Sequence, residues 1–491
     1  MGRSLSTFAR DIAAESLAAI ESDMSERSGR LFVGLVANYF AATRNGGGPV
    51  STPRSAEELA ARFAEPLPAV GRPLQEVVDR LSCDVITDAN HLMHPMALGH
   101  QVAAPLPAAV WTEMVIAALN QSTAIWEMSP TATAIETQLV RSFARLIGWG
   151  SPAGGTLTSG GTEATFTALL AARASALPSA WEDGVGERPP VIVCGEHAHY
   201  CVARAAGQLG LGTRRAIAVS SREWKMDPDA LRATLDALAT AETPVMAVVA
   251  TIGSTPTGSF DDLSIIGPMC EERGIWLHVD GAHGASALLS EAHRHRVRGL
   301  HYARSVAWDA HKMMLLPLAA GMVLVRDESD LEQAFAQHAP YLFHPSADER
   351  AWDQGTRSFQ CSRRADALKL WVALQRYGTA GIASLYDHLC ATTQSLYDRI
   401  LARTDFEAMH APEGNILCFR WVGDSSLDSA ALDGVNRDVR TRYNQSGHGW
   451  VTTTVLAGKR VLRVTVMNPR TTERHLDLLL DQLAIEAGRQ G

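Results

Sequence analysis

The stretch Ser305-Val-Ala-Trp-Asp-Ala-His-Lys-Met-Met-Leu-Leu-Pro-Leu-Ala-Ala-Gly-Met-Val-Leu-Val-Arg326 places one lysine, Lys312, between two apolar runs that have the length of buried strands. A further apolar run, Ile275-Trp-Leu-His-Val279, ends in Asp280. Taken singly, each charged residue also fits an exposed position, because charged side chains are mostly on the surface. Taken together, they fall where the strands of a parallel sheet end, which is where such sheets bind ligands.

The chemistry of this lysine and aspartate points to one cofactor. A lysine amine can form a Schiff base with an aldehyde, and a buried aspartate can keep a pyridine nitrogen protonated. Lys312 and Asp280 therefore predict pyridoxal 5'-phosphate as the cofactor.

A glycine-rich helix start offers a place for the phosphate. Gly160 and Gly161 directly precede an amphipathic helix pattern, and their backbone N–H groups can approach an anion. Thr162 adds a hydroxyl at the helix start. Such a turn is common, so by itself it is weak support. It lacks the lysine that follows the glycines of a nucleotide P-loop, and this disfavours ATP.

The segment Glu196-His-Ala-His-Tyr-Cys201 follows an apolar strand pattern at 190–194. His197, His199 and Cys201 suggest a metal site, but alternate residues at a helix start do not share a face. No second cluster of ligands has a matching spacing, so we expect no metal. His199 is instead the candidate for stacking on the cofactor ring.

In their order along the chain, these motifs resemble those of the group II pyridoxal-phosphate-dependent amino acid decarboxylases. The resemblance extends from about residue 94 to 472, and includes Val249-Ala-Thr-Ile-Gly-Ser-Thr-Pro-Thr-Gly-Ser-Phe-Asp-Asp262 and Asn468-Pro-Arg-Thr-Thr472. Members of this family act on aromatic amino acids, glutamate, cysteine sulfinate, diaminobutyrate and lysine. The resemblance implies the α/β fold of the PLP-dependent transferases (fold type I), with a mainly parallel central sheet.

The resemblance also implies a cofactor cradle. Lys312 would bind the cofactor aldehyde and Asp280 would pair with the ring nitrogen. His199 would stack on one face of the ring, with Ala282 against the other. The remaining residues implied for cofactor binding are Gly161, Thr162, Thr251, Ser305, Asp309 and His311.

Two further residues are implied to act on the substrate. Tyr341 lies in His338-Ala-Pro-Tyr-Leu-Phe-His344, a stretch rich in turn formers that reads as a loop. It matches a tyrosine that closes over the substrate and can return a proton to Cα. An alternative is that Tyr341 is a surface anchor. Arg363 is expected near the substrate carboxylate or the mobile loop.

The predicted reaction is decarboxylation of an L-amino acid to its amine, with two rivals. A PLP-dependent aldehyde synthase or carbon–carbon lyase could use the same cradle. The related aldehyde synthases typically have phenylalanine in place of the loop tyrosine, so Tyr341 favours decarboxylation. A non-enzymatic regulatory homologue is expected to lose Lys312, Asp280 or His199, and this chain keeps all three.

The substrate is less well defined. The segments 94–105 and 120–130 resemble the pocket region of the family, and here they carry His100, Gln101, Ser122 and Ala124 in place of aromatic side chains. Without rings there is no stacking surface for an indole or catechol, so a polar or charged substrate side chain is predicted. It is equally open that these residues merely repack the wall.

Composition agrees with an enzyme that binds small molecules. The chain has 491 residues, 46% of them hydrophobic, and a net charge of −9, which argues against a nucleic-acid surface. Its seven cysteines are odd in number and scattered, as is ordinary for reduced thiols. With no signal-peptide pattern and no long apolar stretch, we expect a cytoplasmic protein without membrane contact.

Three segments are predicted: a helical region over 1–106, a large PLP-binding α/β domain over 107–377 and a small α+β domain over 378–491. Apolar runs at 191–194, 245–251, 275–279, 304–308 and 321–325, separated by helix patterns, predict the parallel sheet. The apolar helix faces of the N-terminal region predict a homodimer with a shared active site.

Overall fold

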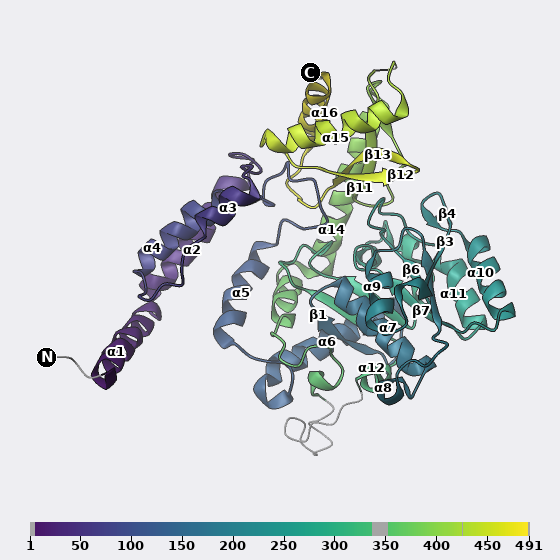
Figure 1. Cartoon of the computed structure of the whole chain (residues 1–491), viewed down its shortest axis with the longest axis horizontal. Helices are drawn as coiled ribbons and strands as arrows, with labels where there is room; N and C mark the ends of the chain where they lie inside the picture. Colours follow the sequence, from purple (N-terminus) through teal and green to yellow (C-terminus); the bar gives the residue numbers. More distant parts are fainter. Residues whose placement is uncertain (1–4, 336–351, 425, 490–491) are drawn as a thin grey trace. The chain divides into compact units, whose positions relative to one another are not determined.

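The chain is described here from a computed structural model that covers residues 5–335, 352–424 and 426–489 (Figure 1). By its internal contacts it separates into two compact units. The smaller unit comprises residues 1–98, 438–451 and 470–491, and the larger comprises 99–437 and 452–469. The three segments expected from the sequence remain a prediction. The internal contacts divide the chain into two units instead, and both sheets belong to the larger one.

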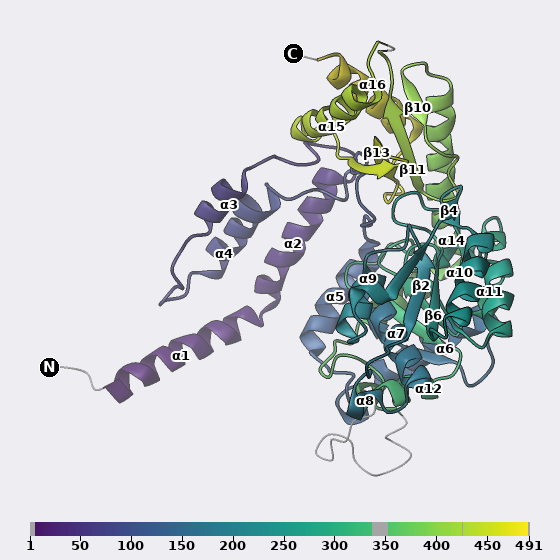
Figure 2. The same cartoon turned by 45° about the vertical axis from the view of Figure 1, so that its right-hand side comes forward.

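A seven-stranded sheet runs through the larger unit, and two of its strands, β2 and β6, are labelled in Figure 2. Its strand order is β1-β9-β8-β7-β6-β2-β3. Its strands are β1 (Gly154–Thr158), β2 (Val191–Gly195), β3 (Ala216–Val219), β6 (Val245–Thr251), β7 (Trp276–Asp280), β8 (Ser305–Asp309) and β9 (Gly321–Val325). Only β9 within this sheet is antiparallel to its neighbours, β1 and β8, and the other pairs are parallel. The mainly parallel sheet and the fold class predicted from the sequence are confirmed.

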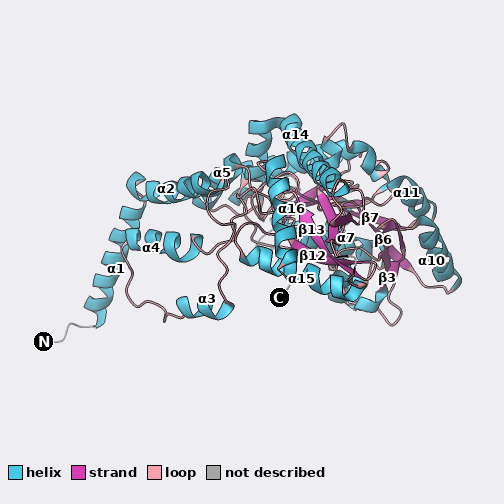
Figure 3. Cartoon of the chain, turned by 90° about the horizontal axis from the view of Figure 1, so that it is seen from above, coloured by secondary structure: helices cyan, strands magenta, loops and turns pink. Residues whose placement is uncertain are grey.

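Helices follow or precede most of these strands and cover them (Figure 3). Their bounds are α5 (Pro107–Leu119), α6 (Pro130–Ile147), α7 (Gly161–Ala176), α8 (Ala180–Asp183), α9 (Cys201–Gln208), α10 (Pro228–Thr240), α11 (Leu263–Glu272), α12 (Ser329–Ala334) and α14 (Ala367–Leu401). Consecutive residues of β8 show the two covered faces. Ala307 packs in the cluster with α7, whereas Trp308 stacks edge-on against Phe143 of α6 at 4.8 Å. Strands buried on both faces explain the unbroken apolar runs.

A second sheet, of four antiparallel strands, lies in the same unit. Its strands are β10 (Phe406–Ala408), β11 (Ile416–Trp421), β12 (Thr452–Leu456) and β13 (Lys459–Thr465), in the order β10-β11-β13-β12. Segments 415–420, 450–456 and 461–466 of the sequence alternate like antiparallel strands, and they correspond to β11, β12 and β13. The sequence patterns did not give β1, or α15 (Ser429–Gln445), which connects β11 to β12. The short hairpin β4 (Ser221–Arg222) and β5 (Lys225–Met226) completes the strands described.

The smaller unit is helical, as expected for the N-terminal region. It contains α1 (Leu5–Asp23), α2 (Glu26–Thr43), α3 (Ala56–Arg62), α4 (Leu74–Arg80) and α16 (Glu473–Gly488). Ser25 and Ser55 cap α2 and α3, which explains where these helices begin. Among the described helices, none is both long and apolar enough to cross a membrane.

Candidate active site

A pocket of about 390 Å³ opens at the carboxyl ends of β6, β7 and β8 in the larger unit. Thr251 and Asp280 are directly paired in the register of β6 and β7, and Asp280 pairs with Ala307 of β8. The lining residues are Gln101, Ser159–Glu163, His199–Cys201, Thr251, Gly253, Thr255, Asp280, Ala282, His283, Asp309, His311, Lys312 and Leu318. The pocket therefore brings together most of the residues implied for cofactor binding.

Asp280 is the last residue of β7 and is buried. Burial raises the pKa of its carboxyl group, and the nearby Lys312 opposes that rise. The backbone N–H of Ala282 donates a hydrogen bond to Oδ1 at 3.2 Å. A buried carboxylate stabilised by a cation rather than by solvent suits a site that receives a protonated ring nitrogen.

Lys312 follows β8 in a turn held by its neighbours. Its Nζ lies 3.2 Å from Oδ2 of Asp309, and Nε2 of His311 lies 3.4 Å from the same oxygen. Nδ1 of His311 accepts a hydrogen bond from the backbone N–H of Ala320 at 3.1 Å. The other carboxylate oxygen of Asp309, Oδ1, is buried and has no partner among the described residues. The lysine is thus fixed at the pocket wall beside an incompletely satisfied acid.

The start of α7 forms a cradle that has no room for side chains. A Cβ atom at Gly161 would lie 2.6 Å from Cβ of Ala282, and one at Gly160 would lie 3.1 Å from Cε1 of His311. No side chain caps this 16-residue helix. The unpaired N–H groups and the helix dipole favour an anion at this point.

His199 lines the same pocket between β2 and α9. Its Nδ1 accepts a hydrogen bond from the backbone N–H of Cys201 at 3.3 Å, so this ring nitrogen carries a lone pair. Burial lowers the pKa of the imidazole, with Asp280 opposing and Lys312 adding to the effect. A neutral flat ring at this position fits the stacking role implied for it.

Thr251 ends β6 and is held in place by a second buried acid. Asp261 accepts hydrogen bonds from the backbone N–H groups of Thr251 and Met226, each at 2.7 Å. Burial raises the pKa of Asp261 to about 6. The carboxylate of Asp261 therefore accepts hydrogen bonds from the backbone, whereas Asp280 lines the pocket.

Ser305 does not line the pocket. Ser305 is at the opposite end of β8 from the pocket, fully buried, where its Oγ accepts from Nε1 of Trp276 at 2.8 Å and bonds Nδ1 of His278 at 2.9 Å. It cannot contact a phosphate at the start of α7, so that expectation is corrected. The types of side chain in a five-residue strand do not tell which of its two ends faces the pocket.

Arg363 is also placed differently from the expectation. Its two terminal nitrogens donate to the carboxylate of Glu136 at 2.9 and 2.7 Å, and both side chains are buried. It does not line the pocket of this chain. A guanidinium already paired bidentately has little capacity left for a substrate carboxylate, so this geometry does not support the role expected for Arg363.

Only one of the four pocket residues predicted to contact the substrate side chain lines the pocket. Gln101 lines the pocket, whereas His100, Ser122 and Ala124 do not line it in this chain. Ser122 forms an isolated bridge with Arg364, and Ala124 is buried. Tyr341 lies outside the described residues.

Arg463 was not predicted from the sequence. It lies on β13, 5% exposed, and its Nε and Nη2 have no hydrogen-bond partner among the described residues. It is close enough to His283 in the pocket wall to lower the pKa of that ring. The available signal was an arginine within the apolar run 461–466. An unpaired buried cation is costly, which marks it as a place for an anionic ligand.

The residues present fit pyridoxal 5'-phosphate. The pocket offers an amine for the aldehyde, an acid for the ring nitrogen, an imidazole for the ring face and a glycine cradle for the phosphate. Among the described residues, no group of three or more metal-ligating side chains converges. The donor set is that of an organic cofactor with one basic nitrogen and one phosphate.

Comparisons with known proteins give the same answer. The family described as "Pyridoxal-dependent decarboxylase conserved domain" matches residues 57–422. L-2,4-diaminobutyrate decarboxylase of Rhizobium meliloti (strain 1021) is 32% identical over 424 residues, 85% of this chain and 83% of that protein. Cysteine sulfinic acid decarboxylase of Rattus norvegicus is 31% identical over 446 residues, 87% and 89% of the two chains.

Solved structures share the whole architecture. The crystal structure of mouse CSAD in apo form has a TM-score of 0.88 and 27% identity, and the match covers 96% of this chain and 99% of that one. The family resemblance and the cofactor predicted from the sequence are confirmed. The chain belongs to the pyridoxal-dependent decarboxylase family and is a PLP-dependent amino acid carboxy-lyase.

Proposed function

We propose that this enzyme decarboxylates an L-amino acid with a polar or charged side chain, using Lys312, Asp280 and His199 as the residues that hold and tune the cofactor. The observation that carries the proposal is the convergence of these three side chains with the α7 cradle in one pocket. The cofactor supplies an electron-withdrawing ring that accepts the electron pair left when the carboxylate departs.

Each side chain has a task that follows from its position. Lys312 would hold the cofactor aldehyde through Nζ. Asp280 would keep a proton on the ring nitrogen, and His199 and Ala282 would contact the two faces of the ring. The N–H groups at Gly161 and Thr162 receive the phosphate. Asp309 and His311 orient the lysine, as their contacts with each other and with Nζ indicate.

Arg463 is proposed to bind the substrate carboxylate. Its guanidinium is buried and has no ion pair among the described residues, and burial lowers its pKa. A bound carboxylate would supply the missing charge through charge-assisted hydrogen bonds. This role takes the place of the one expected for Arg363.

Tyr341 is proposed to protonate Cα after carbon dioxide leaves. In Tyr341→Phe, carbon dioxide is still released, but protonation slows and molecular oxygen diverts the reaction to aldehyde, ammonia and hydrogen peroxide. Amine, aldehyde and peroxide are quantified in one reaction. Amine formed at the wild-type rate and yield would exclude Tyr341 as the donor. The same assay tests the aldehyde-synthase alternative, because wild-type enzyme should give amine without peroxide.

The proposed substrate class is based on the residues that line the pocket and on the substrates named for similar proteins. The proteins named above act on diaminobutyrate and on cysteine sulfinic acid, and others are named acidic amino acid decarboxylases. Gln101 and Thr255 offer polar groups to a side chain in this pocket. Carbon dioxide release measured over the twenty common L-amino acids, 2,4-diaminobutyrate and cysteine sulfinate identifies the substrate. A preference for tryptophan or tyrosine would contradict the proposal.

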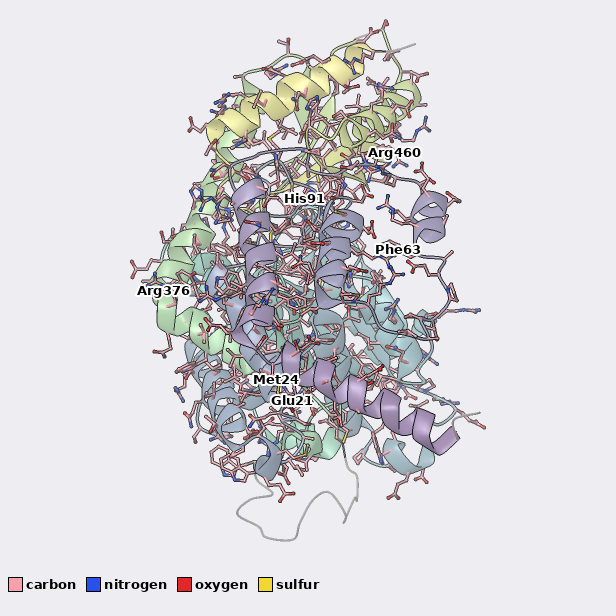
Figure 4. All side chains as sticks on the ribbon, turned by 90° about the vertical axis from the view of Figure 1, so that its left-hand side faces the viewer. Glu21, Met24, Phe63, His91, Arg376 and Arg460 are labelled. Atoms are coloured by element: carbon pink, nitrogen blue, oxygen red, sulfur yellow. The ribbon has the colours of Figure 1, made fainter. Side chains whose placement is uncertain are left out.

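We also propose that the enzyme is a cytoplasmic homodimer. Leu17 and Ile20 on α1, with Met24 directly after it, follow the spacing of one helix face and are 61%, 55% and 71% exposed. Met24 is labelled in Figure 4. A second copy would cover this apolar stripe and could bring the segment around Ser122 to the partner's cofactor. Sedimentation of an active monomer at assay concentration would contradict it.

A further inference from the structure

His283 connects the pocket wall to the four-stranded sheet through one buried hydrogen bond. Its Nε2 lies 2.7 Å from Oδ1 of Asn415, which immediately precedes β11. His283 and Asn415 are 5% and 1% exposed. His283 is also three residues beyond Asp280 and lines the pocket.

The direction of this hydrogen bond follows from the other contacts of Asn415. Its Nδ2 donates to the carbonyl oxygen of Val466 at 2.9 Å, so Oδ1 must face the histidine. Oδ1 is an acceptor, and Nε2 of His283 therefore carries the hydrogen. Nδ1 then carries a lone pair, and it is buried without a partner among the described residues.

Asn415 in turn holds the end of the strand that carries Arg463. Besides the side-chain bond, its carbonyl oxygen accepts from the backbone N–H of Val466 at 2.9 Å. Val466 follows directly after β13. Two residues, Asn415 and Val466, therefore link His283 by hydrogen bonds to the end of the strand that carries Arg463.

The ring of His283 lies in the field of two cations. Burial, with smaller contributions from Lys312 and Arg463, lowers its pKa to about 3. The ring is therefore neutral and adds no charge that would repel the guanidinium. Asn415 donates and accepts in fixed directions, so the bridge has one favoured geometry.

We infer that His283 is a positioning residue that, through Asn415, sets the distance between Arg463 and the cofactor site. The inference rests on the proposed role of Arg463 as the substrate carboxylate anchor. Substrate carboxylate binding should then depend on the hydrogen bond from Nε2, whereas binding of the amine product, which has no carboxylate, should not.

The test uses the holoenzyme, the amino acid that gives most carbon dioxide in the screen, and its own amine product as inhibitor. In His283→Leu the bond is lost, and we expect KM to rise about tenfold because small misplacements of a binding group are expensive. The inhibition constant of the amine should stay within about twofold, since no carboxylate is involved. In His283→Gln an N–H donor is kept, and KM should return to within about threefold of wild type.

Two further variants keep the outcomes separable. Asn415→Ala breaks the bridge from the other side and should reproduce the KM effect if His283→Leu fails to fold. Arg463→Gln tests the anchor itself. An unchanged KM in Arg463→Gln would overturn the proposed anchor. A raised KM there, with KM unchanged in both His283→Leu and Asn415→Ala, would overturn only the positioning role. Equal rises in KM and in the amine inhibition constant, without rescue by glutamine, would show a merely structural residue.

Discussion

Two regions of the larger unit bury charged side chains in opposite ways. At the corner formed by α5, α6, β1 and the start of α14, Arg363 is paired with Glu136, and Lys369 is paired with Glu113 at 2.6 Å. In the pocket wall, burial raises the pKa of Asp280. Arg463 is not among the lining residues, but it lies near His283 of that wall and has no ion pair among the described residues. The first region satisfies its charges within the chain, whereas the second leaves them for ligands.

The difference explains how the same residue type can serve stability in one region and catalysis in another. Glu136 also accepts the backbone N–H of Leu157 at 3.0 Å, so the corner fixes β1 just before the α7 cradle. Breaking a satisfied buried pair leaves an isolated charge and destabilises the fold. Removing a charged side chain that has no partner within the chain and binds a ligand should instead reduce activity and leave the fold intact.

Lys312→Ala should give the largest loss on the functional side of the comparison. Turnover should fall by about 10⁴-fold or more, because the residue that holds the cofactor is gone. The folded state should persist, since the side chain of Lys312 is 22% exposed and its ion pair is with a pocket acid. Carbon dioxide release and circular dichroism are measured on the same samples. Near wild-type activity would remove the central assignment.

Asp280→Asn should come next. The near-isosteric amide cannot keep a proton on the ring nitrogen, so the rate should drop by about 10²–10³-fold with cofactor still bound. Stability of the apoprotein should not fall, because burial raises the pKa of Asp280 and disfavours its charged form. The rate is compared with the cofactor content measured by absorbance. An unchanged rate at full occupancy would refute the pairing.

A matched pair of arginine variants tests the comparison directly. Arg363→Gln leaves Glu136 buried without its cation, and the free energy of unfolding should fall by about 3–5 kcal/mol. Its activity per folded molecule should change little. Arg463→Gln should raise KM by about 10–100-fold, the effect of losing hydrogen bonds to a charged group, without lowering stability. Urea unfolding and steady-state kinetics are run on both. Reversed results would show that the two arginines were assigned the wrong way round.

The smallest effect concerns pH. His283 has a pKa of about 3 in the folded chain and 6.5 when exposed, so the unfolded chain takes up a proton first as the pH falls. The contribution of the neutral ring is therefore full above pH 6.5 and is lost as the pH falls toward 3. In His283→Gln, stability should fall less steeply over this window, by about 1.4 kcal/mol per pH unit. Unfolding free energies between pH 4.5 and 7 check this. Parallel curves would contradict the neutral buried state.

The sequence by itself determined five of the seven strands of the large sheet, all but β1 and β3, and the centre of the site. Lys312, Asp280, His199 and the Gly160–Gly161 turn each end or follow a buried strand, and strand ends of a parallel sheet converge by geometry. Local sequence patterns are enough for this, because the burial of a strand and the start of a helix can be predicted from residues that are close together in the sequence.

The tertiary structure alone decided which charges are satisfied. Arg363 and Glu136 lie 227 positions apart, and Asn415 and His283 lie 132 apart, so no local pattern relates them. Ser305 and Asp309 occupy the same strand, but its direction places only Asp309 at the pocket. A buried charge needs a partner, and which residue meets that need depends on contacts that form only when the chain is folded.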